Sequence, residues 1–234
     1  MDFPIFGALT PAVAAREAAG MTAPSSPKTA IAVILAGGKG TRLGGVTKAA
    51  LTVGGLTLLE RVRAVLAAQA KTVLLSVGAT QMDDDWVTAA GLPVIADPIA
   101  DAGPLGGIAG ALVWARAYAP NAAAIVSTPV DVPFLPDDLI ARLMQEDGIA
   151  VAQSGDQRHH AVAAWPLAVA DDLLSAVAKG ERTLRRWQER HPLRRVSWPT
   201  TPYDPFFNIN TPEDLSAAER IAAAAGQGTS RRLA

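Results

Sequence analysis

Residues 30–48 read AIAVILAGGKGTRLGGVTK, a continuous apolar run that leads directly into a glycine-rich loop. A short apolar run that ends at glycine is typical of a strand buried on both faces of a parallel sheet. We therefore expect residues 30–36 to form such a strand, with the loop at its carboxyl end. In open α/β sheets, ligands bind at the carboxyl ends of the strands, so this loop is the first candidate for function.

The loop combines five glycines within residues 37–45 with three cations, Lys39, Arg42 and Lys48. Glycine lets backbone N–H groups approach an anion closely, and three cations suit a triphosphate. The dinucleotide fingerprint does not fit, because no helix follows in the required register, and the Walker A pattern is absent. A flexible turn with solvated basic residues is the alternative. The preceding strand favours phosphate binding.

Short apolar runs alternate with helix-like segments from Thr29 onward, a pattern that predicts parallel βαβ units and the α/β fold class. The expected strands are residues 30–36, 72–77, 93–96, 122–127, 149–153, 161–165 and 195–198, and the expected helices are 58–68, 108–118, 136–145 and 211 to about 225, with two helical pieces before the last strand. We expect one domain over residues 29–225 and a flexible tail over 226–234. Residues 1–28 are either a disordered N-terminal extension or, if translation starts at Met21, in part untranslated sequence.

Composition narrows the functional class. The 234 residues are 50% hydrophobic and carry 21 basic and 22 acidic side chains, for a net charge of −1. No basic face suggests nucleic acid as a partner. The absence of cysteine excludes disulfides, thiolate catalysis and iron–sulfur clusters, and it fits a cytoplasmic protein. No apolar stretch reaches the ~20 residues of a membrane-spanning helix, so we expect no membrane partner.

Two aspartates stand at the carboxyl ends of expected strands. Asp131 follows residues 122–127 within Pro129-Val130-Asp131-Val132-Pro133. A hard oxygen ligand in this position can hold Mg²⁺ against a triphosphate, and a solvated loop aspartate is the alternative. Asp97 follows residues 93–96, either as a ligand of a nucleotide base or as a turn former before a proline.

The run LAGGKGTRLGG at residues 35–45, followed by Lys48, resembles the signature loop of nucleotidyltransferases that use a single Rossmann-like domain. Its Gly44-Gly45 pair, with a lysine three residues on, resembles the molybdenum cofactor guanylyltransferase family. The resemblance extends over almost all of residues 31–215 and includes the Gly-Pro-Leu turn at 103–105 and the motif FNINTPEDL at 207–215. Cytidylyltransferase relatives typically carry alanine at the position of Gly37, which favours guanine.

The resemblance implies a three-layer α/β/α Rossmann-like nucleotidyltransferase fold with a mostly parallel sheet. It also implies transfer of GMP from GTP to the terminal phosphate of molybdopterin or Mo-molybdopterin, with release of pyrophosphate and with Mg²⁺ as cofactor. Other proteins of molybdenum cofactor biosynthesis, or recipient enzymes, would be transient partners. The implied residues are Arg42, Lys48 and Asp131 for catalysis; Leu35, Ala36, Gly37, Gly38, Lys48, Ser76, Asp97 and Asp131 for the nucleotide; Gly103, Gly107, His160, Asn208 and Asn210 for the acceptor; and Asp131 for the metal.

Several alternatives stay open at this point. The chain could be a molybdopterin cytidylyltransferase, a sugar-phosphate nucleotidylyltransferase or a non-catalytic GTP-binding module. Asn208 and Asn210 share one side if the segment is extended, but residues before a proline are also ordinary helix caps. His159 and His160 lie between two expected strands without a third ligand at zinc spacing. The basic residues Lys179, Arg182, Arg185 and Arg186 form either a solvated face or an attractor of a phosphate.

Overall fold

The computed structural model of this chain describes residues 30–37, 47–97, 99 and 102–230. Three of the expectations above concern residues outside these ranges. The N-terminal extension over 1–28 is one of them. The loop residues Gly38 and Arg42 are the second, and the last four residues of the expected tail are the third.

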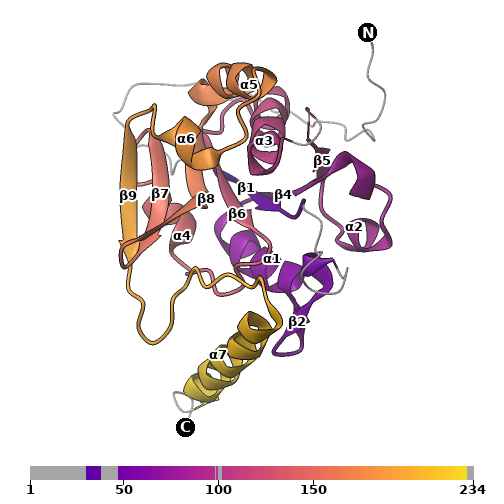
Figure 1. The fold of residues 1–234 in the computed structure, drawn as a ribbon, viewed down its shortest axis with the longest axis vertical. Coiled ribbons are helices and arrows are strands. Elements are labelled where there is room, and N and C mark those ends of the chain that lie inside the picture. The colour runs from indigo at the N-terminus through magenta and orange to yellow at the C-terminus, as the bar shows by residue number, and fades with distance from the viewer. Residues whose placement is uncertain (1–29, 38–46, 98, 100–101, 231–234) are drawn as a thin grey trace, which may run out of the picture.

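A seven-stranded sheet forms the centre of the described residues, in the order β5-β4-β1-β6-β8-β7-β9 (Figure 1). β8 runs antiparallel to both of its neighbours, and the other pairs are parallel. The predicted mostly parallel sheet is therefore confirmed. The strands are β1 (Ala30–Leu35), β4 (Thr72–Val77), β5 (Val94–Ala96), β6 (Ala124–Pro129), β7 (Ile149–Ser154), β8 (Gln157–Pro166) and β9 (Leu193–Trp198).

Helices cover both faces of the sheet, which confirms the predicted three layers (Figure 1). One face packs against α1 and α4, and the opposite face packs against α3, α5 and α6, whereas α7 contacts the short strand β2 (Thr52–Val53) outside the sheet. The helices are α1 (Leu58–Gln69), α2 (Asp85–Ala89), α3 (Pro104–Tyr118), α4 (Leu139–Leu143), α5 (Ala170–Ala178), α6 (Leu184–Gln188) and α7 (Pro212–Ser230), and the short 3-10 helices are η2 (Lys48–Ala50), η3 (Ala79–Gln81) and η4 (Leu167–Val169).

The alternation of side chains along β1 divides the interior into two cores. Ala32 and Ile34 pack on the face of α1, and Ile31 and Val33 pack on the face of α3. All six residues of the strand are buried. Because both faces of this strand are covered, its sequence is continuously apolar instead of alternating, which is why the opening run identified a central strand.

Two local expectations were wrong, and one short hairpin was missed. The helix expected over residues 136–145 spans only Leu139–Leu143. The carbonyl of Pro136 accepts hydrogen bonds from the Leu139 N–H and from Gln69 Nε2, so Pro136 lies in a turn before the helix. The hairpin of β2 (Thr52–Val53) and β3 (Leu56–Thr57) was missed because its strands have two residues each. α7 continues to Ser230 instead of ending near Ala225, because a glycine inside a helix weakens it without ending it.

The strand directions gather the functional candidates at one edge of the sheet. β1, β4, β5, β6, β7 and β9 run the same way, so their carboxyl ends meet at one edge, and β8 begins there. We call this edge the carboxyl edge.

None of the helices in the described ranges is long and apolar enough to cross a membrane.

Gly107 lets α3 pack directly on the sheet at this edge. A Cβ built at Gly107 would clash with the Ser76 hydroxyl and would lie 3.0 Å from Leu35 Cδ2. We predict that Gly107→Ala lowers the free energy of unfolding by about 1–3 kcal/mol, because α3 must move away from the buried side chains of Ser76 and Leu35. Urea denaturation measures the change.

Gly78→Ala is the matched control for this prediction. A Cβ at Gly78 would make only an ordinary contact, at 3.4 Å from Gln81 Oε1. We expect its free energy of unfolding to change by less than about 0.5 kcal/mol. Equal stability of the Gly107→Ala and Gly78→Ala variants would show that the contact of α3 with Ser76 is not tight.

Candidate active site

The start of the glycine-rich loop is fixed between two neighbouring strands. The Leu35 carbonyl accepts a hydrogen bond from the Val130 N–H at 3.0 Å, and the Ala36 N–H donates to the Ser76 carbonyl at 2.8 Å. The side chains of Leu35 and Ala36 are buried, so only their backbone can meet a ligand. A Cβ at Gly37 would lie 3.3 Å from the Gly78 backbone nitrogen, so the loop leaves the sheet against the end of β4.

A lysine bridges two oxygen ligands at the carboxyl edge. Lys48 Nζ, at the start of η2, donates to Asp131 Oδ2 and to Asn210 Oδ1, both at 2.6 Å. The side chains of Lys48 and Asp131 are only 26% and 14% exposed, so this ion pair is shielded from solvent more than a surface pair would be. The Ile209 N–H donates to the Asp131 carbonyl at 3.0 Å and fixes the two segments together.

The start of α7 holds Asn210 in place. The Asp214 carboxylate accepts hydrogen bonds from the N–H groups of Asn210 and Thr211, both at 2.9 Å. The Thr211 hydroxyl accepts in return from the Asp214 N–H. The backbone N–H of Asn210 is the largest of the causes that lower the pKa of Asp214. The helix cap and the contact with Lys48 therefore belong to one rigid turn. Asn208, two residues earlier, has an exposed side chain.

One oxygen of Asp131 has no partner within the described residues. Oδ2 is bonded to Lys48, whereas Oδ1 is buried without a hydrogen bond. A buried carboxylate oxygen without a partner is costly, so a ligand in this position would be stabilised. The described residues contain no cluster of three His, Cys, Asp or Glu side chains. Mg²⁺ does not need one, because it commonly binds one or two carboxylates together with waters and substrate phosphates. The residues fit such an ion.

Ser76 and Asp97 form a polar pair beside the first turn of α3. Ser76 Oγ donates to Asp97 Oδ1 at 3.4 Å. Burial raises the pKa of Asp97 to about 6, and the Ser76 hydroxyl opposes this shift. A Cβ at Gly106 would lie 3.1 Å from the Asp97 carboxylate, so glycine is needed for the helix to pack here. Gly103 begins the helix with φ of +58°. The Asp97 carboxylate can therefore accept hydrogen bonds from N–H donors of a ligand.

Two adjacent histidines face opposite sides of the sheet, and both lie inside β8 and not between two strands as we expected from the sequence. His160 Nδ1 is 2.5 Å from Gln188 Oε1 on α6. His159 packs its ring against Phe206 on the other face, with 4.8 Å between the centroids. The register of β7 against β8 shifts beside them, between Val151 and Ala152. Such bulges re-aim side chains next to active sites.

The structure brings the predicted residues together in two groups. In the first group, Lys48 donates hydrogen bonds to Asp131 and Asn210. In the second group, Ser76 donates to Asp97 and packs against Gly107. His160 lies on the neighbouring strand β8 and contacts neither group directly in the described hydrogen bonds. Sequence reasoning missed Gln188 altogether. Its only local signal was a polar residue beside Trp187 in a short helix.

Known proteins place this chain in a family. Residues 32–196, most of the chain, match the family model described as the MobA-like NTP transferase domain. The chain belongs to this family of nucleotidyltransferases. A relative from Rhodopseudomonas palustris (strain BisB5), named molybdenum cofactor guanylyltransferase, is 43% identical over 198 residues, or 82% of this chain and 93% of that protein. A protein of the same name from Nitrobacter hamburgensis is 42% identical over 83% of this chain and 95% of its own length.

Solved structures support the fold of this family member. The crystal structure of molybdopterin-guanine dinucleotide biosynthesis protein A from Archaeoglobus fulgidus superposes with a TM-score of 0.65. It is 24% identical and covers 82% of this chain and 98% of that chain. The resemblance to the molybdenum cofactor guanylyltransferase family, first seen in the glycine-rich loop, is therefore confirmed over the domain.

The pKa of Asp97 predicts how the stability of this enzyme depends on pH. Because the pKa is raised from 3.8 to about 6 in the folded protein, folding favours the protonated carboxyl. This contribution is fully present below pH 3.8 and is lost as the pH rises through about 6. We predict that the free energy of unfolding of Asp97→Asn increases relative to that of the parent as the pH is raised from 4 to 7. Urea denaturation at several pH values measures the difference, and a constant difference would contradict a buried carboxylate.

Proposed function

We propose that this protein transfers GMP from GTP to the terminal phosphate of molybdopterin and releases pyrophosphate, which forms the molybdopterin guanine dinucleotide cofactor. The observation that carries the proposal is the contact of Lys48 with Asp131 and Asn210 at the carboxyl edge, next to the glycine-rich loop. The names of relatives that are more than 40% identical support the choice of substrates.

The pair of Ser76 and Asp97 beside α3 suits a guanine base. Guanine presents two adjacent N–H donors on one edge, and a carboxylate can accept both. Asp97 is ionised above a pH of about 6, so it is an acceptor at neutral pH. Ser76 orients the carboxylate through its hydroxyl. Cytosine offers only one exocyclic amine on its corresponding edge, so we expect GTP to bind more tightly than CTP.

The reaction needs alignment and charge neutralisation more than a side-chain base. The attacking phosphate is already anionic, so its oxygen can form a bond to the α-phosphorus while the bond to the pyrophosphate oxygen breaks. Lys48 would offset the charge of the triphosphate, and its position between Asp131 and Asn210 keeps the ammonium at the end of β6. The loop residues Gly37 and Gly38, with Arg42, would hold the phosphates through backbone N–H groups and a guanidinium.

We infer that Asp131 would hold Mg²⁺ through the buried Oδ1 that lacks a partner. Magnesium bound there would supply a Lewis acid and a template for the phosphate oxygens. For the acceptor, we propose Asn208 and Asn210 at one side and His160 at the other. Gly103 and Gly107 would shape the first turn of α3 beside Ser76 of β4.

Two rival functions can be separated by assay. A molybdopterin cytidylyltransferase or a sugar-phosphate nucleotidylyltransferase would prefer CTP or another nucleotide in competition with GTP. A non-catalytic GTP-binding module would release no pyrophosphate when molybdopterin is added. A cytoplasmic location, contacts with other cofactor-biosynthesis proteins and the domain limits at residues 29 and 225 stay predictions.

We predict that Asp131→Asn keeps the fold and lowers the rate of product formation by about 100- to 1000-fold, the loss expected when one fixed charge no longer acts on the transition state. The assay combines GTP, molybdopterin and Mg²⁺ and measures pyrophosphate and the mass of the product. Asp171→Asn is the control, because this exposed carboxylate on α5 pairs only with Arg116 among the described ion pairs. An Asp131→Asn protein with the parent rate would refute the metal assignment.

A further inference from the structure

Gln188 is a buried polar side chain that the proposed reaction does not yet use. It lies at the end of α6 with no exposed surface. Its Oε1 is 2.5 Å from His160 Nδ1, and its Nε2 donates to the His160 carbonyl at 3.0 Å. Both polar atoms of the Gln188 amide therefore form hydrogen bonds with His160 of β8. A buried amide placed in this way orders the group that it contacts.

The chemistry of this contact fixes the tautomer of His160. The backbone carbonyl only accepts hydrogen bonds, so the amide nitrogen of Gln188 must face it. The amide oxygen then faces His160 Nδ1 and also only accepts, so Nδ1 must carry the proton. In the neutral ring, Nε2 is consequently left as an acceptor. No hydrogen bond among the described residues occupies it.

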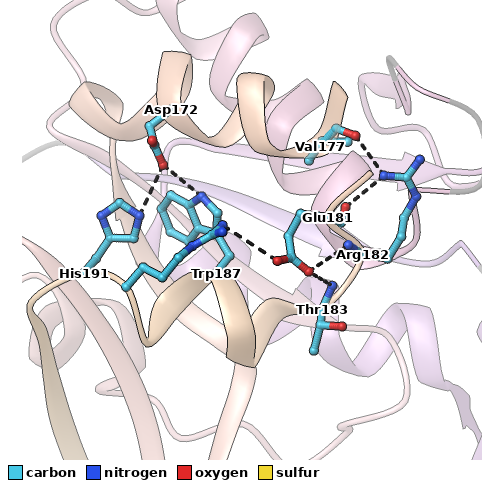
Figure 2. A network of polar contacts seen from close by, with 8 residues as sticks. Asp172, Val177, Glu181, Arg182, Thr183, Trp187 and His191 are labelled. Carbon is cyan, nitrogen blue, oxygen red and sulfur yellow. Dashed lines mark hydrogen bonds and ion pairs between the residues drawn. The ribbon is translucent and has the colours of Figure 1, made fainter. Parts of the chain in front are cut away.

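A polar network fixes the helix that carries Gln188 (Figure 2). Asp172 on α5 accepts a hydrogen bond from Trp187 Nε1 at 2.9 Å and pairs with His191 Nε2 at 3.2 Å. Trp187, the residue before Gln188, is fully buried. At the other end, Glu181 accepts from the N–H groups of Arg182 and Thr183, both at 3.0 Å. The end of α6 is thus fastened to α5, and Glu181 orders the turn that leads into α6.

His160 lies on the same face of the sheet as the pair of Ser76 and Asp97. Its partner Gln188 belongs to α6, Ser76 and Asp97 lie against α3, and both helices cover that face. Both groups also lie at the carboxyl edge, on β8 and β4 respectively. With β1 and β6 between them, three strand spacings of about 4.8 Å separate the two groups by roughly 14 Å across the sheet. A base bound at one end would leave the phosphates over β1 and β6 and the acceptor near β8.

We propose that Gln188 is a positioning residue that presents His160 Nε2 as a hydrogen-bond acceptor to an N–H donor on the heterocycle of the acceptor substrate. The inference rests on the proposed function and adds to it a specificity element. A nitrogen that only accepts would favour a pterin-like ring with N–H groups, and it would not bind a phosphate oxygen. The network around Trp187 serves to hold this amide.

Gln188→Met tests the proposal in the full-length protein. Removal of the amide leaves His160 without its fixed tautomer, and we expect the KM for molybdopterin to rise about tenfold, as for the loss of one hydrogen bond. The KM for GTP should stay within about twofold of the parent value, since Gln188 contacts neither Ser76 nor Asp97 in the described hydrogen bonds. Gln69→Met is the matched control, because Gln69 makes three hydrogen bonds, two of which join α1 to Pro136 before α4 and to Ile140 in α4.

Two outcomes of these kinetics would overturn the proposal. One is an unchanged KM for molybdopterin in Gln188→Met. The other is an equal rise in Gln69→Met, which would indicate a general loss of stability. Gln188 should also act through His160, so Gln188→Met should add no further loss of molybdopterin affinity in a His160→Ala background. Additive losses would contradict a positioning role.

Nitrogen-15 NMR of the histidine rings gives a readout that does not depend on catalysis. The parent protein should show His160 protonated at Nδ1, and Gln188→Met should show a mixture of tautomers. A parent protein with the proton on Nε2 would overturn the assignment even if the enzyme is active. Failure of the proposed function alone would leave the tautomer as expected while no pyrophosphate is formed, so the two failures are distinguishable.

Discussion

The ammonium of Lys48 bridges the carboxylate of Asp131 and the amide of Asn210, and the rest of the site depends on this contact. These residues are 83 and 162 positions apart from Lys48 in the chain, so the contact joins the end of the glycine-rich loop, the end of β6 and the start of α7. A partly buried carboxylate needs a compensating charge. Lys48 provides it on one oxygen, and the other oxygen stays available for a ligand. The same electrostatic requirement that closes the fold here therefore prepares a site for a cation and phosphates.

The order of the strands turns this contact into a directional site. β4, β1, β6 and β8 lie side by side, and each delivers one component to the carboxyl edge. Asp97 lies beside Ser76 of β4, the glycine-rich loop follows β1, Asp131 follows β6 and His160 belongs to β8. Along this edge a base, a triphosphate, a metal and an acceptor ring would meet the chain in that order. The antiparallel direction of β8 explains how His160 reaches this edge. Because β8 begins at the carboxyl edge, its first residues, and not its last, lie where the acceptor ring would bind.

The sequence predicted those parts of the fold that depend on local patterns. The doubly buried β1 was visible as an uninterrupted apolar run, and Asp131 was visible because a strand followed by a turn places its first polar residue at the carboxyl edge. The limits of α4 and the hairpin before α1 were not predictable, since tertiary contacts decide where short elements begin and end. The end of α7 was misplaced because a glycine inside a helix weakens it without ending it. Gln188 was not predictable for a related reason. Its partner lies 28 residues away, and nothing in either segment alone indicates that they meet.

The position of the divalent ion tests the central claim most directly. A crystal of the protein with α,β-methylene-GTP and Mn²⁺ would reveal the ion by its anomalous scattering. We expect the ion to lie against Asp131 Oδ1, the oxygen without a partner, with Lys48 Nζ within hydrogen-bond distance of the phosphates. An ion and nucleotide bound away from the carboxyl edge, with Asp131 still paired only to Lys48, would contradict the account.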